Sequence, residues 1–442
     1  MEKKPLTSPY SGVLGWIDAR LPIPRMLDRE YLQFRVPKNL TYFWSFGGIL
    51  MLTLMSLIIS GLALGMHYKP SADEAFDSVQ RIMRDVNYGW LIRYMHMNAA
   101  HFFFIAVYIH IFRGIYFGSY KQPRELLWIF GVIIFFLMMA TAFLGYTLPW
   151  GQMSYWGATV ITNLFSAIPF VGDSIVVWLL GGYNVGDATV NRFYVLHWFT
   201  AFAIVGVVLL HVTALHITGS NNPSGIEPKD DSETLTFNPF MTIKDLHGAV
   251  VFFTIFAFAL FFVPDYLGHA DNYIPANPLV TPAHIVPEWY FLPFYAILRA
   301  IPDKLMGVVA MVASIGLLAF LPWLDTSRIR SCVFRPVWKW LTLLFVFNFF
   351  VLMYVGAMPA EGTYVTIARV ATVYWFLYLV VLAPLVGLVE VPNRLPADIH
   401  EYERMKQSGE IRFLPFRLPG LPWPTEAEKA QEKAPTRSVP AE

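Results

Sequence analysis

Two stretches of equal length decide the fold of this chain: HMNAAHFFFIAVYIH at residues 96–110 and HWFTAFAIVGVVLLH at residues 197–211. Each is largely apolar, and each begins and ends with a histidine. Fourteen residues make nearly four helical turns, so the two histidines of a stretch lie within about 40° of one helix face and roughly 21 Å apart along the axis. If the two helices run in the same direction, the first histidines face each other, and so do the last. This geometry can hold two haems, one above the other, inside a bilayer.

A single histidine on an apolar helix is more often a hydrogen-bonded core residue than a ligand. The repeated spacing favours the ligand role, because ionisable side chains in a membrane are costly and usually functional. We therefore predict that His96 and His197 ligate one haem and that His110 and His211 ligate a second. The one cysteine, Cys332, excludes internal disulfides, a four-cysteine iron–sulfur cluster and a covalent C-x-x-C-H haem site. Both haems are therefore expected to be non-covalent b-type haems held by histidine alone.

The composition of the chain is that of a membrane protein. Of its 442 residues, 56% are hydrophobic and 14% are charged, whereas a soluble domain has about 25% charged residues. The net charge of +1 gives no indication of a nucleic-acid partner. Because a spanning helix needs about 20 apolar residues, we predict an all-α integral membrane protein with eight transmembrane helices, the first four forming a di-haem bundle. These helices are expected at residues 43–66, 90–115, 126–148, 193–216, 247–263, 306–324, 341–358 and 366–389.

Basic residues alternate between the segments that join these helices. Four segments carry 16 lysines and arginines, and the other four carry 4. The basic segments are 1–41, 113–125, 217–246 and 325–340, and the others are 67–89, 149–190, 264–303 and 359–366. The positive-inside rule then places both termini in the cytoplasm, and no cleavable signal peptide precedes the first helix. The two helices that carry the histidine stretches both run inward from the outer face, so they are expected to be parallel.

The remaining segments divide the chain further. In the outer loop before the fourth helix, two apolar pieces at 155–168 and 174–180 are too short to span and predict helices on the outer surface. The loop at 264–303 is rich in proline and aromatic residues, and long ordered loops are usually functional. The charged, proline-rich tail is expected to have little structure. The predicted division is a cytoplasmic N-terminal arm at 1–41, a di-haem bundle at 42–225, a second membrane region at 226–392 and a cytoplasmic tail at 393–442.

Two glycine pairs repeat the histidine interval. Gly47 and Gly61 lie on the first predicted helix, and Gly131 and Gly145 lie on the third. A haem edge between helices requires a close backbone approach, which glycine allows. Ordinary helix packing also uses glycine, but two pairs at the same interval as the histidines favour haem packing.

Two arginines lie three residues from a predicted ligand. Arg93 precedes His96, and Arg113 follows the last histidine of the first stretch. Near a helix end, a guanidinium can pair with a haem propionate or extend to the membrane interface. Both interpretations stay open for Arg113, whereas the scarcity of basic residues on the outer side favours a propionate partner for Arg93. Two further histidines, His67 at a helix end and His101 at about 140° around the helix from His96, are predicted to be structural or interfacial.

Three motifs carry a resemblance to a known family. They are PEWY at 287–290, GYTLPWGQMSYWGATVITNL at 145–164 and LHITGSNNPSG at 215–225. With the histidine and glycine intervals, they make the chain resemble the cytochrome b of ubiquinol–cytochrome c oxidoreductase, respiratory complex III, of bacterial type. The resemblance extends from about residue 44 to residue 392, and the arm and the tail match no motif of that family.

The resemblance implies a role for each matching residue. The outer histidine pair would ligate a low-potential haem, and the inner pair would ligate a high-potential haem. An outer site for quinol oxidation would be made by Tyr146, Gly157, Pro287, Glu288, Trp289, Tyr290 and Tyr295. An inner site for quinone reduction would be made by His216, Ser220, Lys244 and Asp245.

Elementary chemistry supports part of this assignment. Glu288 lies in a charge-poor loop, where desolvation raises the pKa of a carboxyl and suits it to accept a proton. Outside the PEWY motif it would be read as an ordinary loop carboxylate. Asp245 is expected to open the fifth helix and could be a helix-start acid favoured by the macrodipole, although a role in proton donation is favoured. Lys244 could equally be a positive-inside residue.

We therefore predict a redox subunit of the protonmotive quinone cycle in a bacterial inner membrane. Its expected partners are a Rieske iron–sulfur protein, a membrane-anchored cytochrome of the c type, ubiquinone, the lipid bilayer and a second copy of the complex. A plastid-type plastoquinol complex is the nearest alternative, but that family splits this chain in two. A transmembrane haem reductase would add a nucleotide-binding domain, and no G-x-G-x-x-G follows a strand here. A proton-coupled transporter would show repeated halves with broken helices.

Overall fold

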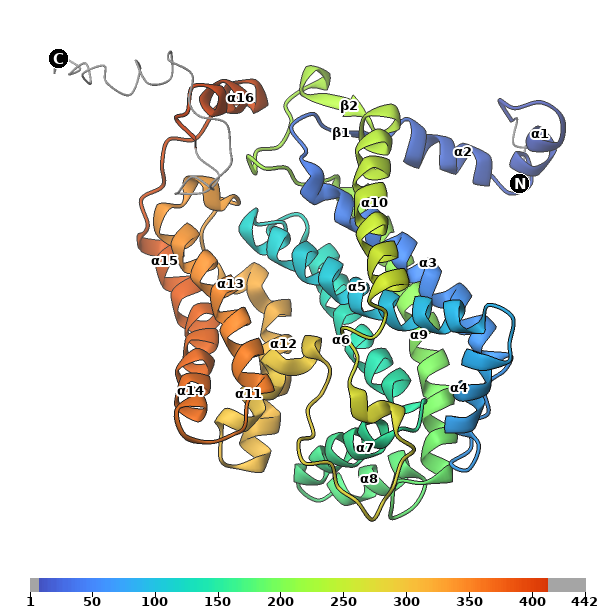
Figure 1. The fold of residues 1–442 in the computed structure, drawn as a ribbon. Coiled ribbons are helices and arrows are strands. Elements are labelled where there is room, and N and C mark those ends of the chain that lie inside the picture. Colours follow the sequence, from blue (N-terminus) through green and yellow to red (C-terminus); the bar gives the residue numbers. More distant parts are fainter. Residues whose placement is uncertain (1–7, 412–442) are drawn as a thin grey trace, which may run out of the picture.

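The computed structural model describes residues 8–411, and these are mostly helical (Figure 1). Eight of the described helices are long and apolar enough to cross a membrane, which confirms the predicted number and the fold class. The first four are Tyr42–Gly65 (a 3-10 turn and α3, Phe46–Gly65), α5 (Gly89–Tyr116), α6 (Glu125–Thr147) and α9 (Asp187–Thr218). The last four are α10 (Phe237–Phe262), α12 (Lys304–Leu324), α13 (Pro336–Ala357) and Gly362–Val389, which joins α14 (Gly362–Phe376), a π-helical turn (Leu377–Leu382) and α15 (Ala383–Val389).

Shorter elements join these spans. Before the first span are α1 (Gly12–Asp18), α2 (Ile23–Leu27), a π-helical turn (Asp28–Leu32) and β1 (Arg35–Pro37). Between later spans are α4 (Ala75–Arg84), α7 (Gln152–Leu164), α8 (Gly172–Leu180), β2 (Thr234–Thr236) and α11 (Leu292–Ala300), and α16 (Ile399–Gln407) follows the last span. The helices α7 and α8 form where two short helices were predicted, with bounds shifted by a few residues.

The first four spans pack as two close pairs, α3 against α5 and α6 against α9. The apolar stretch of α5 is 61% buried inside the protein, whereas the corresponding stretch of α9 is 11% buried. The helix α5 therefore lies at the centre, in contact with α3, α10 and α13. The outward face of α9 is apolar, and a helix can turn such a face to lipid because its backbone hydrogen bonds are satisfied internally.

The fifth span begins earlier than predicted. The helix α10 starts at Phe237, whereas the sequence predicted 247–263. Lys244 and Asp245 are polar residues of the kind that normally mark a loop, but both lie inside the helix, whose only irregular backbone is at Asn238. Asp245 is therefore not a helix-start acid, and the macrodipole explanation for it is wrong.

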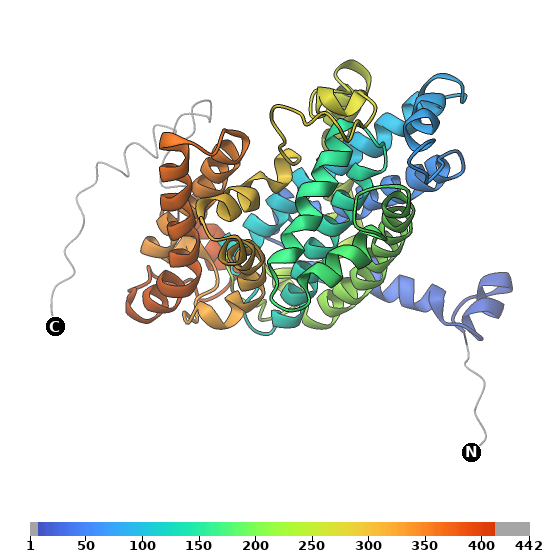
Figure 2. The same ribbon diagram turned by 90° about the horizontal axis from the view of Figure 1, so that it is seen from below.

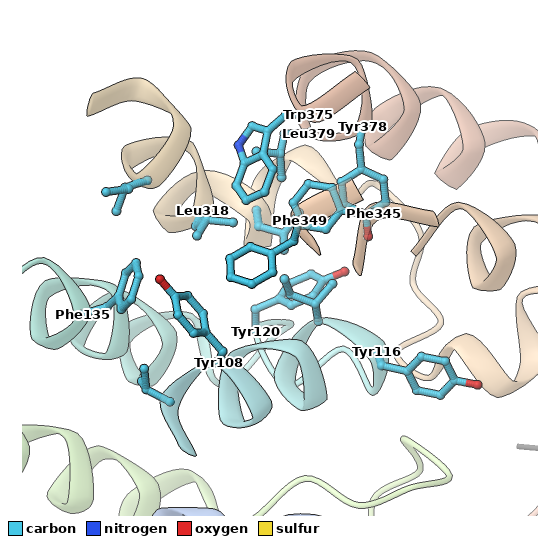
Figure 3. Close-up of a cluster of buried hydrophobic side chains, with 14 of the residues drawn as sticks. Tyr108, Tyr116, Tyr120, Phe135, Leu318, Phe345, Phe349, Trp375, Tyr378 and Leu379 are labelled. Atoms are coloured by element: carbon cyan, nitrogen blue, oxygen red, sulfur yellow. The ribbon is translucent and has the colours of Figure 1, made fainter. Parts of the chain in front are cut away.

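An aromatic core joins the first spans to the last ones (Figure 3). The ring of Tyr108 on α5 lies 4.6 Å from that of Phe349 on α13, between centroids. One turn away, Phe345 lies 4.2 Å from Tyr378 in a stacked arrangement and 4.5 Å from Trp375. Aromatic pairs of this kind each contribute about 0.5–1.5 kcal/mol beyond the burial of their area. The cluster therefore holds α13 and α14 against α5.

A buried ionic cluster closes one end of the same interface. Asp325, which follows α12, lies 2.8 Å from both Arg335 and Lys121 and accepts a hydrogen bond from Tyr120 at 2.5 Å. Arg335 also pairs with Glu390 at 3.0 Å. Because buried charges are tolerated only when they are paired, this cluster specifies how α12, α13 and α15 meet the segment that follows α5.

The segments before the first span and after the last one lie at the same end of the molecule (Figure 1). There β1 pairs antiparallel with β2, while α1 and α2 extend sideways from the bundle (Figures 1 and 2). The helix α16 forms where little structure was predicted, so that prediction is wrong for Ile399–Gln407. Ile399, Tyr402 and Met405 recur at helical spacing and are buried, which gives this polar segment an apolar face to pack. Residues 412–442 of the predicted tail lie outside the described residues.

Candidate functional site

The four histidines of the two quoted stretches form two facing pairs. The ring centroids of His96 on α5 and His197 on α9 lie 6.3 Å apart, with 71° between the ring planes. Those of His110 and His211, on the same two helices, lie 6.4 Å apart with 57° between the planes. The first histidine of one helix meets the first of the other, so α5 and α9 are parallel.

Hydrogen bonds fix how the outer pair is oriented. Nδ1 of His197 donates to the carbonyl of Thr141 at 2.8 Å, and because a carbonyl can only accept, Nε2 keeps its lone pair. Nδ1 of His96 lies 2.9 Å from the hydroxyl of Ser60, which itself donates to the carbonyl of Ser56 at 2.6 Å. The hydroxyl therefore accepts from His96 and leaves Nε2 of that ring free as well. Metal-bound histidines usually have their second nitrogen held in this way.

Each of the four predicted glycines faces a different histidine. Measured from the position that a Cβ would occupy, the nearest ring atom is Cε1 in every case. The distances are 3.8 Å from Gly47 to His110, 3.0 Å from Gly61 to His96, 3.4 Å from Gly131 to His211 and 2.6 Å from Gly145 to His197. A side chain on the two outer glycines would press on a ring, so glycine keeps that space clear.

The two pairs fit a haem each. An imidazole nitrogen binds a first-row metal at about 2.0–2.1 Å, and with about 1.1 Å from nitrogen to ring centre, two imidazoles that share one metal would have centroids up to roughly 6.3 Å apart. The observed separations of 6.3 and 6.4 Å match this value. A terminal guanidinium nitrogen of Arg113 lies 3.1 Å from Nδ1 of His110, and the Nε of Arg113 is buried without a hydrogen-bond partner among the described residues. An unpaired guanidinium nitrogen beside the inner pair suits an anionic group such as a propionate.

A cavity of about 260 Å³ connects the outer pair with the loop that carries the PEWY motif. Its walls include both outer histidines and also Arg93, Tyr146, Glu288 and Tyr290. The structure therefore brings part of the predicted quinol site and the outer histidine pair around one space. Of the residues predicted for the quinol-oxidation site, those that do not line this cavity are Gly157, Pro287, Trp289 and Tyr295.

Glu288 is the buried carboxylate of this cavity, with 8% of the residue exposed. Burial raises its pKa to about 7, and a hydrogen bond with the Tyr146 hydroxyl offsets part of that rise. A carboxyl with a pKa in this range can both accept and release a proton near neutral pH.

His101 is a neighbour of Glu288 that the sequence did not reveal. Its Nδ1 lies 3.9 Å from a carboxylate oxygen of Glu288, and both side chains are buried. The indole N–H of Trp289 donates to the same nitrogen at 3.2 Å, so this nitrogen is an acceptor and the proton of the neutral ring is on Nε2. The one signal for His101 in the sequence was its angle of about 140° from His96, which places it on another side of α5. Only the closing of the loop onto that side supplies its partners.

The same side of α5 holds the PEWY segment in place. Tyr290 stacks on Phe104 with 3.9 Å between ring centroids and 2° between planes. Its carbonyl accepts a hydrogen bond from the hydroxyl of Tyr108 at 2.5 Å. Farther on, the ring of Tyr295 on α11 is covered by the guanidinium of Arg299 at 4.5 Å. Through the ring and the carbonyl of Tyr290, α5 therefore fixes the backbone to which Glu288 is attached.

The residues predicted for the inner site lie on α9, α10 and the loop between them. Nδ1 of His216 lies 2.9 Å from a carboxylate oxygen of Glu30, which the sequence did not single out. Lys244 and Ser220 donate to backbone carbonyls at 2.7 and 2.8 Å. One carboxylate oxygen of Asp245 is buried without a hydrogen-bond partner in the described part of the chain. Within residues 8–411, no hydrogen bond or ion pair joins any two of the four predicted residues.

Eight spanning helices around two facing pairs of buried histidines define a multi-pass membrane protein that is suited to holding haem. Comparison with known proteins gives the same class. The family model described as "Cytochrome b/b6/petB" matches residues 31–219, and "Cytochrome b(C-terminal)/b6/petD" matches residues 275–376. The chain belongs to the cytochrome b family of respiratory complex III, which confirms the resemblance drawn from its motifs.

Individual relatives cover most of the chain. "Cytochrome b" of Rickettsia conorii is 57% identical over 389 residues, which is 88% of this chain and 98% of that protein. "Cytochrome b/c1" of Bradyrhizobium diazoefficiens is 55% identical over 393 residues, which is 89% of this chain and 57% of that longer protein. A solved chain titled "Hyperthermophilic respiratory Complex III" aligns with a TM-score of 0.81 and 36% identity, covering 86% of this chain and 99% of that one. Membership of the family implies b-type haem, quinol oxidation and electron transport in a membrane-bound oxidoreductase complex.

Proposed function

We propose that this chain oxidises quinol at its outer cavity and passes electrons across the membrane through two b haems in a protonmotive quinone cycle. One observation carries the proposal: Glu288 and the outer histidine pair line the same cavity. A quinol at the Glu288 end of that cavity would meet a proton acceptor with a pKa of about 7, and the histidine pair at the other end would hold the electron acceptor. A proton acceptor and an electron acceptor must lie close together for this reaction, because quinol gives up protons as well as electrons.

The chain's own residues would hold one haem at each histidine pair, the outer low in potential and the inner high. Bound b-type haem supplies a one-electron carrier whose potential the surrounding protein tunes. Arg113, with its unpaired Nε, would meet a propionate of the inner haem, and Arg93 would do so at the outer one. Along the helix, the two pairs are roughly 21 Å apart, which spans much of a hydrocarbon core of about 30 Å.

At the outer site, the side chains manage the protons. Oxidation of a quinol to a quinone releases two electrons and two protons. The carboxylate of Glu288 would accept one proton, while the Tyr146 hydroxyl orients it through their hydrogen bond. His101 would not hold the carboxylate, because its Nδ1, 3.9 Å from a carboxylate oxygen, already accepts a hydrogen bond from Trp289. Burial of this group supports the proposal, because it restricts proton exchange to a defined partner.

One of the two electrons would leave for a Rieske iron–sulfur protein docked on the outer side, and the other would enter this chain. A membrane-anchored cytochrome of the c type would be the next carrier. The Bradyrhizobium relative named "Cytochrome b/c1" supports a partner of the c type, and the complex III chain supports assembly in a respiratory complex. Homodimerisation of the complex is proposed on family membership alone.

Quinone reduction would take place at the other end of the bundle, between His216, Ser220, Lys244 and Asp245. The unpaired buried oxygen of Asp245 supports a polar ligand at this place. Gly48 faces the same carboxylate, with 3.6 Å from its Cβ position to Oδ2 of Asp245. Glycine there leaves the carboxylate open to a ligand.

The remaining parts of the proposal concern orientation and quinone type. The alternation of basic residues supports cytoplasmic termini in a bacterial inner membrane. Glutamate in the PEWY motif supports ubiquinone as the substrate by resemblance. The two separate family matches support the division into a di-haem bundle at 42–225 and a second membrane region at 226–392.

A reduced-minus-oxidised spectrum with a potentiometric titration of the purified complex tests the proposal. We expect two b-type haems that titrate at separate potentials. One haem, or none, would refute the two-haem arrangement and favour the histidines as a proton relay in a transporter.

A further inference from the structure

A carboxylate from the N-terminal arm contacts the inner site. Glu30 lies in the π-helical turn Asp28–Leu32, and its Oε2 is 2.9 Å from Nδ1 of His216, a residue 186 positions away. The two side chains are mostly buried, with 21% of Glu30 and 15% of His216 exposed. Tyr31 and Phe34 flank the imidazole, with ring centroids 5.6 and 4.5 Å from it. The arm therefore fixes this ring both by a hydrogen bond and by packing.

We propose that Glu30 is a positioning residue for quinone reduction, which holds His216 as a proton donor to the bound quinone. The inference rests on the proposed function, in which His216 lines the quinone-reduction site. An ionised carboxylate can only accept a hydrogen bond, so Nδ1 of His216 carries a proton. In the described part of the chain Nε2 of His216 has no hydrogen-bond partner, and it is the nitrogen that remains for a quinone oxygen.

The guanidinium of Arg29 keeps Glu30 ionised. The guanidinium of Arg29 lies 2.5 Å from Oε1 of Glu30 and lowers the pKa of that carboxyl, and the hydrogen bond with His216 lowers it further. The carboxylate thus has one oxygen on an exposed arginine and the other on a partly buried histidine. The turn also packs against α10, but among residues 8–411 neither Lys244 nor Asp245 of that helix forms a hydrogen bond or ion pair with His216.

The contact between Glu30 and His216 resembles catalytic sites in which a carboxylate orients an imidazole. A carboxylate on one nitrogen fixes the tautomer and stabilises the imidazolium form. Reduction of a quinone to a quinol consumes two electrons, which the proposed function supplies from the inner haem, and two protons from the inner aqueous phase. The imidazolium gives the proton on Nε2 to one quinone oxygen, and the N–H bond facing Glu30 stays intact. The ring then takes a replacement proton from water, and other groups of the site supply the second proton.

Glu30→Gln in the purified complex tests this role, with Asp28→Asn as the matched control. Asp28 lies on the same turn but accepts its hydrogen bond from Gln33 at 2.6 Å instead of from His216. The measurement is the rate at which the pre-reduced inner haem is reoxidised by a short-chain ubiquinone, followed across pH and across ubiquinone concentration. We expect Glu30→Gln to slow the limiting rate roughly tenfold at alkaline pH and to move the pH at which the rate falls downward by about one unit. Asp28→Asn should match the wild type, and Glu30→Asp should recover most of the rate.

Two outcomes would overturn the inference. One is a pH profile of Glu30→Gln that matches that of Asp28→Asn, and the other is an equal loss at every pH with no movement of the profile. If Glu30→Gln does not assemble with full haem content, Glu30→Asp, which sets the charge farther from the ring, must show a smaller shift in the same direction. An unshifted profile in that variant also overturns the inference.

His216→Leu separates this inference from the proposed function. If the inner haem of His216→Leu is reoxidised by ubiquinone at the wild-type rate, the assignment of quinone reduction to His216 is wrong. If His216→Leu is slow and Glu30→Gln is normal, only the role of Glu30 is wrong. Slow reoxidation in both variants, with a shifted profile only in Glu30→Gln, supports the inference.

Discussion

Replacing Gly145 with alanine should weaken the binding of the outer haem and leave the inner one unchanged. A Cβ at this position would lie 2.6 Å from Cε1 and 2.9 Å from Nδ1 of His197. Favourable carbon contacts are about 3.5–4.0 Å, so the ring would have to move by roughly 0.9 Å or more. It is not free to do so, because its Nδ1 is held by the carbonyl of Thr141 at 2.8 Å.

The size of the effect follows from this crowding. Overpacking in a close-packed interior costs about 1–3 kcal/mol, and every 1.4 kcal/mol is a tenfold change in affinity. Haem affinity at the outer pair should therefore fall about 5- to 150-fold in Gly145→Ala. Gly47→Ala is the matched control, because its Cβ would lie 3.8 Å from Cε1 of His110, an ordinary contact.

The assay is haem content per chain, combined with a potentiometric titration of each purified variant. We expect Gly145→Ala to keep the component of one potential and to lose or weaken the other, and Gly47→Ala to keep both. Two haems at unchanged potentials in Gly145→Ala would refute the reasoning. An equal loss of haem in both variants would do the same, because the two sites differ in clearance and not in residue type.

The remaining predictions concern the proton acceptor, an inner ligand and the ionic cluster. Glu288 has a pKa of about 7, so its ionised fraction rises from about one tenth at pH 6 to about nine tenths at pH 8. The rate of haem reduction by quinol should rise close to tenfold over that range and should be low and flat in Glu288→Gln; a slope that survives the substitution counts against a proton role. His211→Leu should leave one b haem per chain, by spectrum and titration, and two would contradict its role as a ligand. Asp325→Asn leaves Lys121 without an ionic partner among the described residues and Arg335 with Glu390 alone, and should lower stability by about 3–5 kcal/mol, seen as a lower denaturation temperature followed by haem absorbance; an unchanged temperature would show that Asp325 does not stabilise the fold.

Features that depend on a single helix could be predicted from the sequence. The facing of His96 and His197 follows from helix geometry once two helices are parallel, and the number of spans follows from the thickness of the bilayer. The start of α10 was not predicted correctly, because Lys244 and Asp245 are polar residues inside a helix. Hydropathy treats such residues as a boundary, whereas in the folded chain Lys244 donates to a backbone carbonyl and one oxygen of Asp245 is buried without a partner among the described residues.

Contacts between distant segments could not be predicted in this way. Glu30 meets His216 across 186 residues, and Trp289 meets His101 across 188 residues. Neither partner has a local pattern that indicates the other, because each contact depends on where an arm or a loop closes onto a span. The PEWY motif located Glu288 by resemblance, but only the folded loop brings His101 to that carboxylate.

The central helix α5 presents two functional faces. His101, Phe104 and Tyr108 lie about 140°, 80° and 120° around its axis from His96, whereas His110 lies within about 40° of it. One face carries the histidines, and the other holds Glu288 and the rest of the PEWY segment. Because both faces belong to one helix, the helix itself sets the distance between Glu288 and the outer histidine pair. Two occupied faces also leave α5 little surface for lipid, which explains why it is the most buried of the described spans.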